Sequence, residues 1–415
     1  RRDPERQRRQ RTLRLRPEAP TPDAIHIPDQ VTAIVRRLEE AGYETWCVGG
    51  AIRDALLGGP GTDVDLATAA PPTVVRSLFR RTVPVGIEHG TIGVLDEQGV
   101  LHEVTTFRHD VVTDGRHAVV AFGASLEEDL ARRDFTINAI AYHPIQERWA
   151  DPFDGRADLA AGLVRAVGNP AQRFREDRLR ILRALRFAAR LNFVIDEPTW
   201  TAAVAQSDDI AHLSAERVRE EWIKGLSSAR DVVELARLWE ASGVARTWLP
   251  ELRVERASAL GAIPLADRDA GMLTAQLCVP SASVWRRFKG SSAEVRRAEA
   301  IDRGPVAPAS PAARDVRRWM ARVGDATDDL MALAQWQDGD AATWTREVVG
   351  VRQRGEATSR GALAISGNDL IREGVVPPGP QLGAVLEALL EQVLDDPSLN
   401  TREALLTVAR AVVLR

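Results

Sequence analysis

Two aspartates separated by a single residue, Asp63 and Asp65, follow shortly after a pair of glycines, Gly49 and Gly50. The aspartates fall in an apolar stretch that predicts a strand, whose period of two directs both carboxylates to one face. Such a pair suits Mg²⁺, and two of these ions could activate an attacking hydroxyl and stabilise a leaving pyrophosphate. A glycine pair that opens a helix leaves backbone N–H groups free to receive phosphate. Each signal alone has an ordinary alternative, a simple turn or a solvated strand end.

The elements around these residues are predicted to form an α/β head. A buried strand over Thr45–Val48 leads into the glycine turn, and a short helix over Ala51–Leu57 follows it. An apolar period of 3.6 predicts an earlier helix over Ile27–Ala41. The other predicted elements are a helix over Pro72–Arg81 and strands over Thr91–Leu95 and Leu101–Thr106. Glu103, in the last strand, could be a third carboxylate beside the aspartate pair or an ordinary edge-strand glutamate.

A second charged segment stands directly before an apolar run. Ser125 can cap a helix with Glu128 in capping-box register, and Arg132-Arg133-Asp134 follow two turns later. The apolar run after Asp134 must be buried, so charges at its border need partners. A solvated charged face is the ordinary alternative.

A helix is predicted over Phe174–Leu191, with apolar residues on one side and arginines on another. Asp177 and Arg180 lie about 60° apart around this helix and share an edge. They could form a plain ion pair on a basic surface. Alternatively, the carboxylate accepts from the exocyclic amine of C or A while the guanidinium donates to a ring nitrogen or carbonyl oxygen. Such a pair could select C and A and reject G and U without a nucleic-acid template.

Four motifs, taken in this order, resemble the class II tRNA nucleotidyltransferase and poly(A) polymerase family. They are Gly-Gly-x-x-Arg-Asp from Gly49, Asp-x-Asp from Asp63, Arg-Arg-Asp-Phe-Thr-x-Asn-Ala from Arg132 and Glu-Asp-x-x-Arg from Glu176. The resemblance is dense over residues 25–230 and thinner over 360–405. One departure is Thr62, where the family often has Lys. The resemblance implies an α+β fold, in which a nucleotidyltransferase α/β head is followed by an all-helical neck, body and tail.

The resemblance also implies a role for each matching residue. Asp63 and Asp65 would be catalytic, binding Mg²⁺ and lowering the pKa of the primer 3′-hydroxyl. Asp134 would accept the ribose 2′-hydroxyl, and Asp177 with Arg180 would choose the base. The other residues implied to contact the nucleotide are Gly49, Gly50, Arg53, Arg133, Arg183 and Arg186. A later helix with Ser214 as N-cap would support the nucleotide-reading helix.

The polar segment Phe107–Phe122 is predicted to be a mobile loop. It resembles the flexible loop with which the family switches from C to A addition. The loop residues that match are Arg108, Asp114 and Arg116. This copy departs from the family pattern at Thr113 and Ala118. The presence of the loop argues against an enzyme that adds only C.

Composition places few limits on partners. The 415 residues are 44% apolar and 27% charged, with a net charge of −4 that gives no overall bias toward nucleic acid. No apolar run is long enough for a membrane span. Only two cysteines, Cys47 and Cys278, are present, which excludes structural disulfides and a thiolate metal site. With an Arg-rich start that lacks an apolar signal core, these features predict a cytoplasmic protein.

Five segments are predicted. They are a disordered Arg-rich tail over 1–22, the head over 23–165, a nucleotide-reading neck over 166–232, a helical body over 233–350 and a helical tRNA-binding tail over 351–415. The arginines of 1–22 could touch RNA phosphate or simply be solvated. A break inside the body is predicted at Pro305, Pro308 and Pro311.

The resemblance implies template-independent addition of CCA to the 3′ end of tRNA from CTP and ATP, with release of pyrophosphate. No membrane and no stable protein partner are predicted. An enzyme that adds only the terminal A, or a poly(A) polymerase, shares the head motifs. An inactive RNA-binding protein with the same fold is disfavoured because the aspartates and the base-choosing pair are all present. Nucleotide transfer to a small molecule would need neither the basic helix nor the helical tail.

Overall fold

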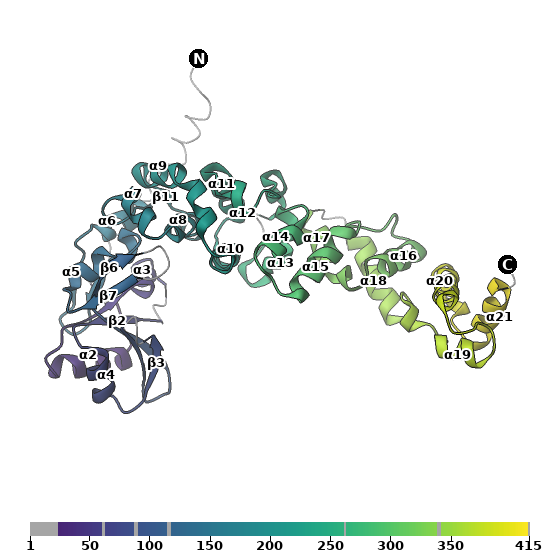
Figure 1. The fold of residues 1–415 in the computed structure, drawn as a ribbon, viewed down its shortest axis with the longest axis horizontal. Helices are drawn as coiled ribbons and strands as arrows, with labels where there is room; N and C mark the ends of the chain where they lie inside the picture. Colours follow the sequence, from purple (N-terminus) through teal and green to yellow (C-terminus); the bar gives the residue numbers. More distant parts are fainter. Residues whose placement is uncertain are drawn as a thin grey trace, which may run out of the picture. The chain divides into compact units, whose positions relative to one another are not determined.

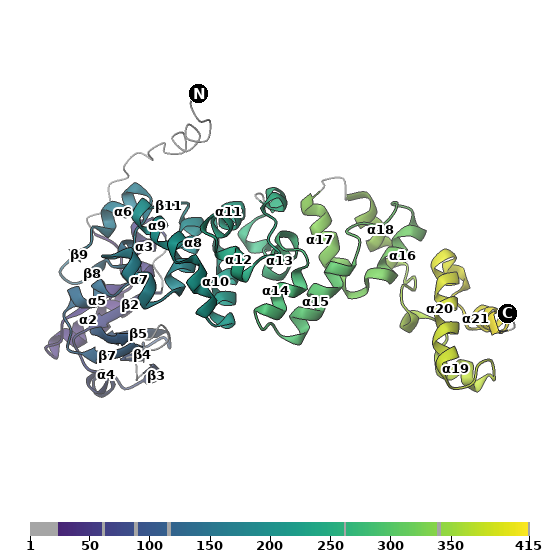
Figure 2. The same cartoon turned by 45° about the horizontal axis from the view of Figure 1, so that its top comes forward.

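A computed structural model describes residues 24–59, 63–86, 90–113, 118–260, 263–337 and 342–413, in two compact units. The first unit ends at Trp248 and contains a β-sheet, and the second begins at Leu249 and is built from helices (Figures 1 and 2). This combination confirms the predicted α+β class. Among the residues described, no helix is long and apolar enough to cross a membrane.

A mixed seven-stranded sheet lies at the centre of the first unit, in the order β3-β4-β5-β2-β1-β8-β9. Its strands are β1 (Thr45–Val48), β2 (Asp65–Thr68), β3 (Thr82–Gly86), β4 (Thr91–Leu95), β5 (Leu101–Thr106), β8 (Ala141–His143) and β9 (Arg148–Ala150). β1 pairs antiparallel with β2, and β2 pairs parallel with β5. The parallel register aligns Leu66 with Val104. Asp65 and Glu103, one residue earlier on each strand, are therefore neighbours.

Both faces of this sheet bear packed elements. Helices α2 (Asp29–Glu40) and α4 (Pro72–Leu78) contact each other and the sheet, as Figure 1 shows at the lower end of this unit. Both correspond to predicted helices; α2 ends one residue and α4 three residues earlier than expected. Elsewhere, Trp46, Val48 and Ala67 form a buried cluster with Leu130 of α5 (Leu126–Ala131). Helix α5 begins with the predicted capping box between Ser125 and Glu128.

The segment predicted as a loop contains a two-stranded antiparallel hairpin. Its strands are β6 (Arg108–Thr113) and β7 (Ala118–Phe122), and Arg108 pairs with Phe122 at the base. Residues 114–117, including the predicted loop residues Asp114 and Arg116, lie outside the described part of the chain.

The nucleotide-reading helix predicted over Phe174–Leu191 is two helices. Helix α7 (Pro170–Glu176) ends at Asp177, whose backbone is extended, and α8 (Leu179–Leu191) begins two residues later. The Asp177 carboxylate accepts the Leu179 backbone N–H at 3.0 Å. A side chain that bonds to nearby backbone in this way competes with helix formation. The prediction of one continuous helix was therefore wrong at Asp177.

Further helices complete the first unit. They are α3 (Gly50–Leu56), α6 (Gly155–Ala161), α9 (Glu197–Ala205), α10 (Ala215–Ser228), α11 (Val232–Ser242) and α12 (Val244–Trp248). Helix α8 packs on α10 and α11, and its apolar face is buried. Ser214 caps α10 as predicted, its side chain accepting the Arg217 backbone N–H.

The second unit has two apolar clusters. One joins α13 (Ala270–Leu277), α15 (Ser292–Arg303), α16 (Ala313–Val323), α17 (Thr327–Gln337) and α18 (Ala342–Gln353). The other joins α19 (Gly367–Arg372), α20 (Pro380–Asp395) and α21 (Arg402–Val413). Helix α14 (Ser281–Arg287) packs on α15. The predicted proline-rich break falls between α15 and α16, where the chain is not helical.

Candidate active site

Two aspartates lie at the start of β2, and Glu103 lies beside them on the adjacent strand β5. Asp65 is its first residue and is partly buried, whereas Asp63, two residues earlier, is exposed. Burial, then the charges of Glu103 and Asp63, raise the pKa of Asp65 to about 6, while Arg133 acts in the opposite direction. Glu103 is thus an electrostatic neighbour of Asp65. Within the described ranges, no three His, Cys, Asp or Glu side chains lie close enough together to hold a metal ion.

The glycine turn lies directly against these carboxylates. Gly49 has a positive φ of 86°, and a Cβ built on it would lie 3.1 Å from Oδ2 of Asp65 and 3.6 Å from Nη1 of Arg133. A Cβ on Gly50 would lie 3.4 Å from Nη2 of Arg53. Only glycine fits the backbone angle and the crowding at Gly49, because a side chain there would be strained and would press on Asp65. The turn, Asp65 and Arg133 therefore share one small volume.

Arg53 is held inside the protein. Its side chain is almost fully buried, and it donates to Asp54 at 2.9 Å and to Oδ1 of Asn138 at 2.6 Å. Its guanidinium also lies 5.1 Å from the centre of the Phe187 ring. Burial lowers the pKa of Arg53, and the Asp54 charge opposes that shift. Arg53 was expected at the triphosphate, but here its guanidinium supports the glycine turn from beneath.

Asp134 has no spare acceptor position. Its Oδ1 accepts from the Phe135 backbone N–H at 2.8 Å and from Asn138 at 2.9 Å, and its Oδ2 accepts from Nε of Arg183 at 2.7 Å and pairs with Nη2 at the same distance. Burial alone would raise the pKa of Asp134, but the Arg183 charge and these hydrogen bonds lower it below the usual range. The expected contact with a ribose hydroxyl would require one of these donors to move.

Arg133 is oriented by a buried acid that the sequence analysis did not single out. Asp129, on α5, is 1% exposed and accepts from Nη2 of Arg133 at 3.2 Å and from Nε of Arg132 at 3.0 Å. Nη1 of Arg133 lies near Gly49 and donates to the Asn138 carbonyl at 3.4 Å. One carboxylate thus fixes both arginines at the end of α5.

Asp177 and Arg180 do not pair with each other. Asp177 accepts from Nη2 of Arg217, on α10, at 3.1 and 2.9 Å to its two oxygens. Arg180 donates to Glu176 at 3.0 Å and to the Arg132 carbonyl at 3.0 Å. The break between α7 and α8 separates the two side chains. Their predicted shared helix edge is wrong, and each has its own partner.

Arg183 and Arg186 surround an aromatic ring. Their guanidinium carbons lie 5.4 and 4.4 Å from the centre of the buried Phe187 ring, and that of Arg53 lies 5.1 Å from the same centre. Glu221, a buried residue of α10, accepts from Nε of Arg186 at 2.6 Å. Three cations around one ring and one buried acid make this part of α8 rigid.

The comparisons with known proteins agree with this arrangement. The model of the poly A polymerase head domain matches residues 45–165, that of the probable RNA and SrmB-binding site of polymerase A matches 192–255, and that of tRNA nucleotidyltransferase domain 2 matches 330–409. A CCA-adding enzyme of Leuconostoc mesenteroides is 36% identical and covers 92% of this chain and 95% of its own. The chain belongs to the CCA-adding enzyme family.

Solved structures extend this likeness to the fold. The CCA-adding enzyme of Bacillus stearothermophilus in complex with CTP has a TM-score of 0.78 at 30% identity, covering 92% of this chain and 97% of that one. The Thermotoga maritima CCA-adding enzyme complexed with tRNA has a TM-score of 0.64 at 20% identity, covering 93% and 95%. The second likeness, at that identity, shows the shared fold alone.

Within this CCA-adding family member, sequence reasoning missed several residues of the site. Asn138 was recognised only as part of the motif that begins at Arg132. Its side chain in fact hydrogen-bonds to both Arg53 and Asp134. Asp129, Phe187 and Glu221 were not named. Because α8 carries several arginines, acidic partners for them could have been expected on a neighbouring helix such as α10. The i,i+3 and i,i+4 spacing from Asp129 to Arg132 and Arg133 could have predicted these ion pairs. The burial of Asp129 comes from tertiary packing and has no local signal.

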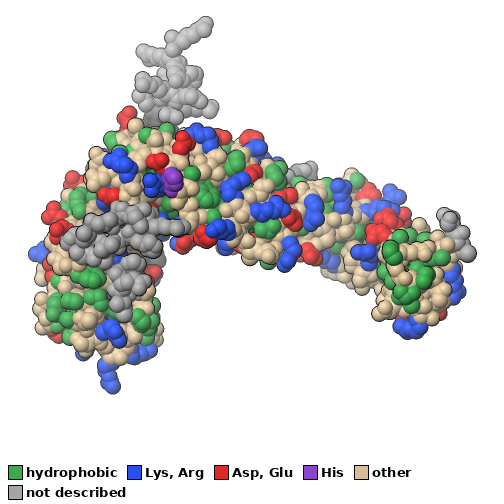
Figure 3. Space-filling model, viewed as in Figure 1, with side chains coloured by type: hydrophobic (Ala, Val, Ile, Leu, Met, Phe, Trp, Pro, Cys, Tyr) green, Lys and Arg blue, Asp and Glu red, His purple; other side chains and the backbone are tan. Residues whose placement is uncertain are grey.

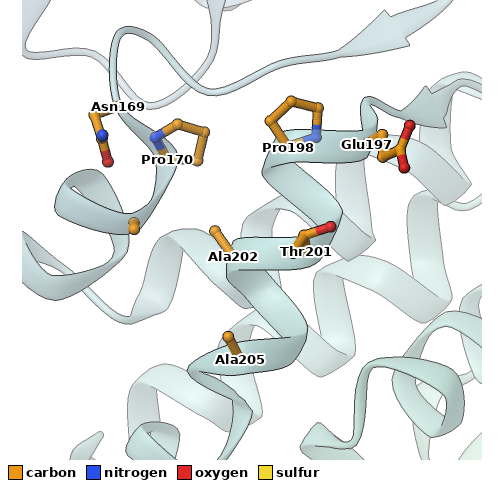
Figure 4. A pocket seen from close by; sticks show the side chains of 8 residues that line it. Asn169, Pro170, Glu197, Pro198, Thr201, Ala202 and Ala205 are labelled. Carbon is orange, nitrogen blue, oxygen red and sulfur yellow. The ribbon is translucent and has the colours of Figure 1, made fainter.

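A separate shallow pocket lies between α7 and α9 (Figure 4). Its wall consists mainly of small or apolar side chains, with Pro170, Pro198, Ala202 and Ala205 among them. Asn169 is occupied as the cap of α7, accepting from the Gln172 backbone N–H. None of the predicted site residues line this pocket.

Proposed function

We propose that this protein completes the 3′ end of tRNA by adding C, C and A from CTP and ATP without a template, releasing pyrophosphate at each step. The observation that carries the proposal is the meeting of Asp65, Arg133 and the Gly49 turn in one small volume. The nucleotide-reading break lies close in space, because Arg180 donates to the backbone at Arg132, the residue before Arg133. Full-length similarity to CCA-adding enzymes supports the same conclusion.

In this proposal, Asp63 and Asp65 hold Mg²⁺. Burial and neighbouring carboxylates raise the pKa of Asp65 to about 6, so the site has an excess of negative charge that a divalent cation would relieve. When bound, the ion would lower the pKa of the 3′-hydroxyl and stabilise the charge that develops on the pyrophosphate. Glu103 stays a possible third carboxylate, acting on Asp65 through its charge.

Gly49, Gly50 and Arg133 would receive the triphosphate, with Arg53 supporting the turn from below. The bare backbone of the turn allows an anion to approach its N–H groups closely. Arg133, oriented by Asp129, supplies a positive charge beside Asp65. The 3′-oxygen then attacks the α-phosphorus, forming the new P–O bond as the bond to pyrophosphate breaks, and the hydroxyl proton is released.

Asp177 and Arg180 would choose the base, because each has unused hydrogen-bonding positions. Oδ2 of Asp177 accepts only from Arg217, so it can also accept from an exocyclic amine of C or A. A guanidinium has five N–H donors, and Arg180 uses three, on Arg173, Glu176 and Arg132. The remaining donors can reach a ring nitrogen or carbonyl oxygen. G and U present the opposite pattern.

Several further assignments belong to the same proposal. Arg108, Asp114 and Arg116 would take part in the change from C to A addition. Arg183 and Arg186 would contribute positive charge at the nucleotide. The division into head, neck, body and a tail that binds tRNA follows from the family resemblance, and a cytoplasmic location follows from the composition.

Extension of three tRNA transcripts on a sequencing gel tests the proposal. The transcripts end at the discriminator base, after one added C or after two, and each receives CTP, ATP or both. We expect completion of CCA on all three. Extension of the third transcript alone would mean addition of A only, and a long ladder with ATP would indicate a poly(A) polymerase. Either result would contradict the proposed activity.

A further inference from the structure

The sheet face that carries Asp65 continues past it toward the edge strand. Glu103, the neighbour of Asp65 on β5, pairs with Gly93 of β4, and Gly93 pairs with Val83 of β3. Paired residues direct their side chains to the same face. A single row therefore runs from the carboxylates across three strands. On the opposite face, Ile92, Val94 and Val104 are buried.

This outer part of the face is apolar and exposed. Val83, Val85 and Leu101 are 40%, 45% and 40% exposed. A Cβ on Gly93 would lie 2.6 Å from Cδ1 of Leu101 and 2.9 Å from Cγ2 of Val85, so these two side chains converge over the glycine. Val83, Val85, Gly93 and Leu101 form a continuous surface, here called the apolar shelf. None of these four residues is charged. Two arginines border them: Arg81, whose carbonyl accepts the Leu95 backbone N–H opposite Leu101, and Arg108, the cross-strand partner of Phe122.

An aromatic ring lies beside Gly90, three residues before Gly93 of the shelf. Phe122, at the base of the β6–β7 hairpin, is 45% exposed. A Cβ on Gly90 would lie 2.5 Å from Cε1 of this ring, so the ring rests on the Gly90 backbone. The next residue, Thr91, bonds across the strands to Thr105 through their hydroxyls at 3.0 Å. Phe122 is thus supported from below by main chain and open to solvent.

We propose that the apolar shelf and the Phe122 ring seat the terminal bases of the RNA acceptor. This inference rests on the proposed function, which requires the 3′-hydroxyl to reach Asp63 and Asp65. The arginines at the glycine turn suit the triphosphate, whereas the four shelf side chains next to the carboxylates are uncharged and apolar. That surface suits base faces better than phosphates. The bases behind the 3′-hydroxyl have to lie somewhere next to the carboxylates, and the shelf is continuous with them.

The chemistry of three successive additions favours such a surface. The acceptor ends in the discriminator base, then in one C, then in two, so its last base changes between steps. A pocket of hydrogen-bonding groups would favour one of these ends. Stacking on an aromatic ring and contact with aliphatic side chains tolerate any base, because every base has an apolar face.

Fluorescence of an acceptor that carries 2-aminopurine as its last base tests this directly, since stacking quenches this base. We expect quenching on binding to wild-type protein and to Phe122→Trp, and much weaker quenching with Phe122→Ala. Filter binding of the same RNA controls for loss of the complex, and thermal unfolding controls for loss of the fold. Equal quenching by Phe122→Ala and wild type would overturn the inference.

Steady-state kinetics separates the acceptor from the nucleotide. For Phe122→Ala and Val85→Asp we expect KM for the acceptor to rise about tenfold, the size of one stacking contact, with KM for CTP unchanged. Val194→Asp is the matched control, because Val194 is 58% exposed and lies in β11 (Val194–Ile195), outside the main sheet.

Three results would contradict parts of this account. A wild-type protein that does not extend tRNA would overturn the proposed function itself. An active wild type whose shelf variants keep the normal acceptor KM would overturn only the shelf. If Val85→Asp instead converts a dimer to a monomer without changing the acceptor KM, the shelf would be a contact with a second copy of the chain.

Discussion

At the scale of single residues, the charged groups of the site are fixed by other residues of the chain. Asp129 orients Arg133 by accepting its hydrogen bond. In the same way, Arg183 donates to Asp134 and Arg217 donates to Asp177. Each partner removes rotamer freedom that nucleotide binding would otherwise have to restrict. The geometry on which the proposed base choice depends is therefore built largely into the protein.

Replacing Asp63 or Asp65 with Ala should abolish transfer and leave tRNA binding largely intact. We expect the rate of nucleotide addition to fall roughly a thousandfold or more, because metal-assisted stabilisation of the transition state is worth several kcal/mol. Single-turnover extension and filter binding measure the two properties separately. Loss of tRNA binding in proportion to the loss of rate would count against the metal role.

Replacing Arg217 with Ala should reduce discrimination between bases. Asp177 would lose the donor that orients both of its oxygens. We expect slower addition of C and A and more addition of U and G, measured as the ratio of kcat/KM values for CTP and UTP. Arg217→Lys should restore part of the ratio. Lys224→Ala, which removes an exposed pair on the same helix, is the control. A general loss of rate with an unchanged ratio would assign Arg217 a purely structural role.

The Asp134 interaction predicts a pH dependence of stability. Its pKa is lowered in the folded protein, so the stability it contributes is present above the unfolded carboxyl pKa of about 3.9 and is lost as pH falls through the lower native value. Urea unfolding of wild type and Asp134→Asn between pH 7 and pH 3 measures this contribution. We expect the difference between the two proteins to shrink below about pH 4. A difference that stays constant down to pH 3 would contradict the account.

At the scale of elements, helix α10 is the support for both halves of the nucleotide-reading region. Arg217 reaches the break between α7 and α8, and Glu221, one turn further along α10, reaches Arg186 of α8. Arg173 and Arg180 donate to carbonyls at the end of α5, which leads into the Arg132-Arg133-Asp134 segment. The same contacts therefore connect base choice with the residues near the carboxylates.

Glu221→Gln should destabilise the first unit strongly, whereas Glu220→Gln should not. The Glu221–Arg186 pair is buried, with side chains 5% and 9% exposed, so removing the acid leaves a buried cation without its partner. We expect a loss of about 3 kcal/mol in the free energy of unfolding. Glu220 pairs with Lys224 at the surface and should contribute less than about 1 kcal/mol. Similar effects of the two variants in chemical denaturation would contradict a supporting role for Glu221.

At the scale of the whole molecule, sequence reasoning located the head, the glycine turn and the helical remainder, because each has a local pattern. It missed the break at Asp177, because helical periodicity does not reveal that the Asp177 side chain accepts the backbone N–H of Leu179. It did not predict that Arg53 is buried against Asn138 and Phe187, which lie far along the chain. Partners this distant in sequence leave no local signal. The surface agrees with the modest net charge, as Figure 3 shows acidic and basic side chains interspersed over the visible face.

The central claim is that the protein itself chooses the base, through Asp177 and Arg180, at a site shared by all three steps. The most direct measurement is to incubate a tRNA transcript that ends at its discriminator base with all four nucleoside triphosphates and to sequence the new 3′ ends. We predict that wild type produces CCA ends alone and that Asp177→Ala introduces U and G. Mixed ends from wild type, or faithful CCA ends from Asp177→Ala, would contradict this account.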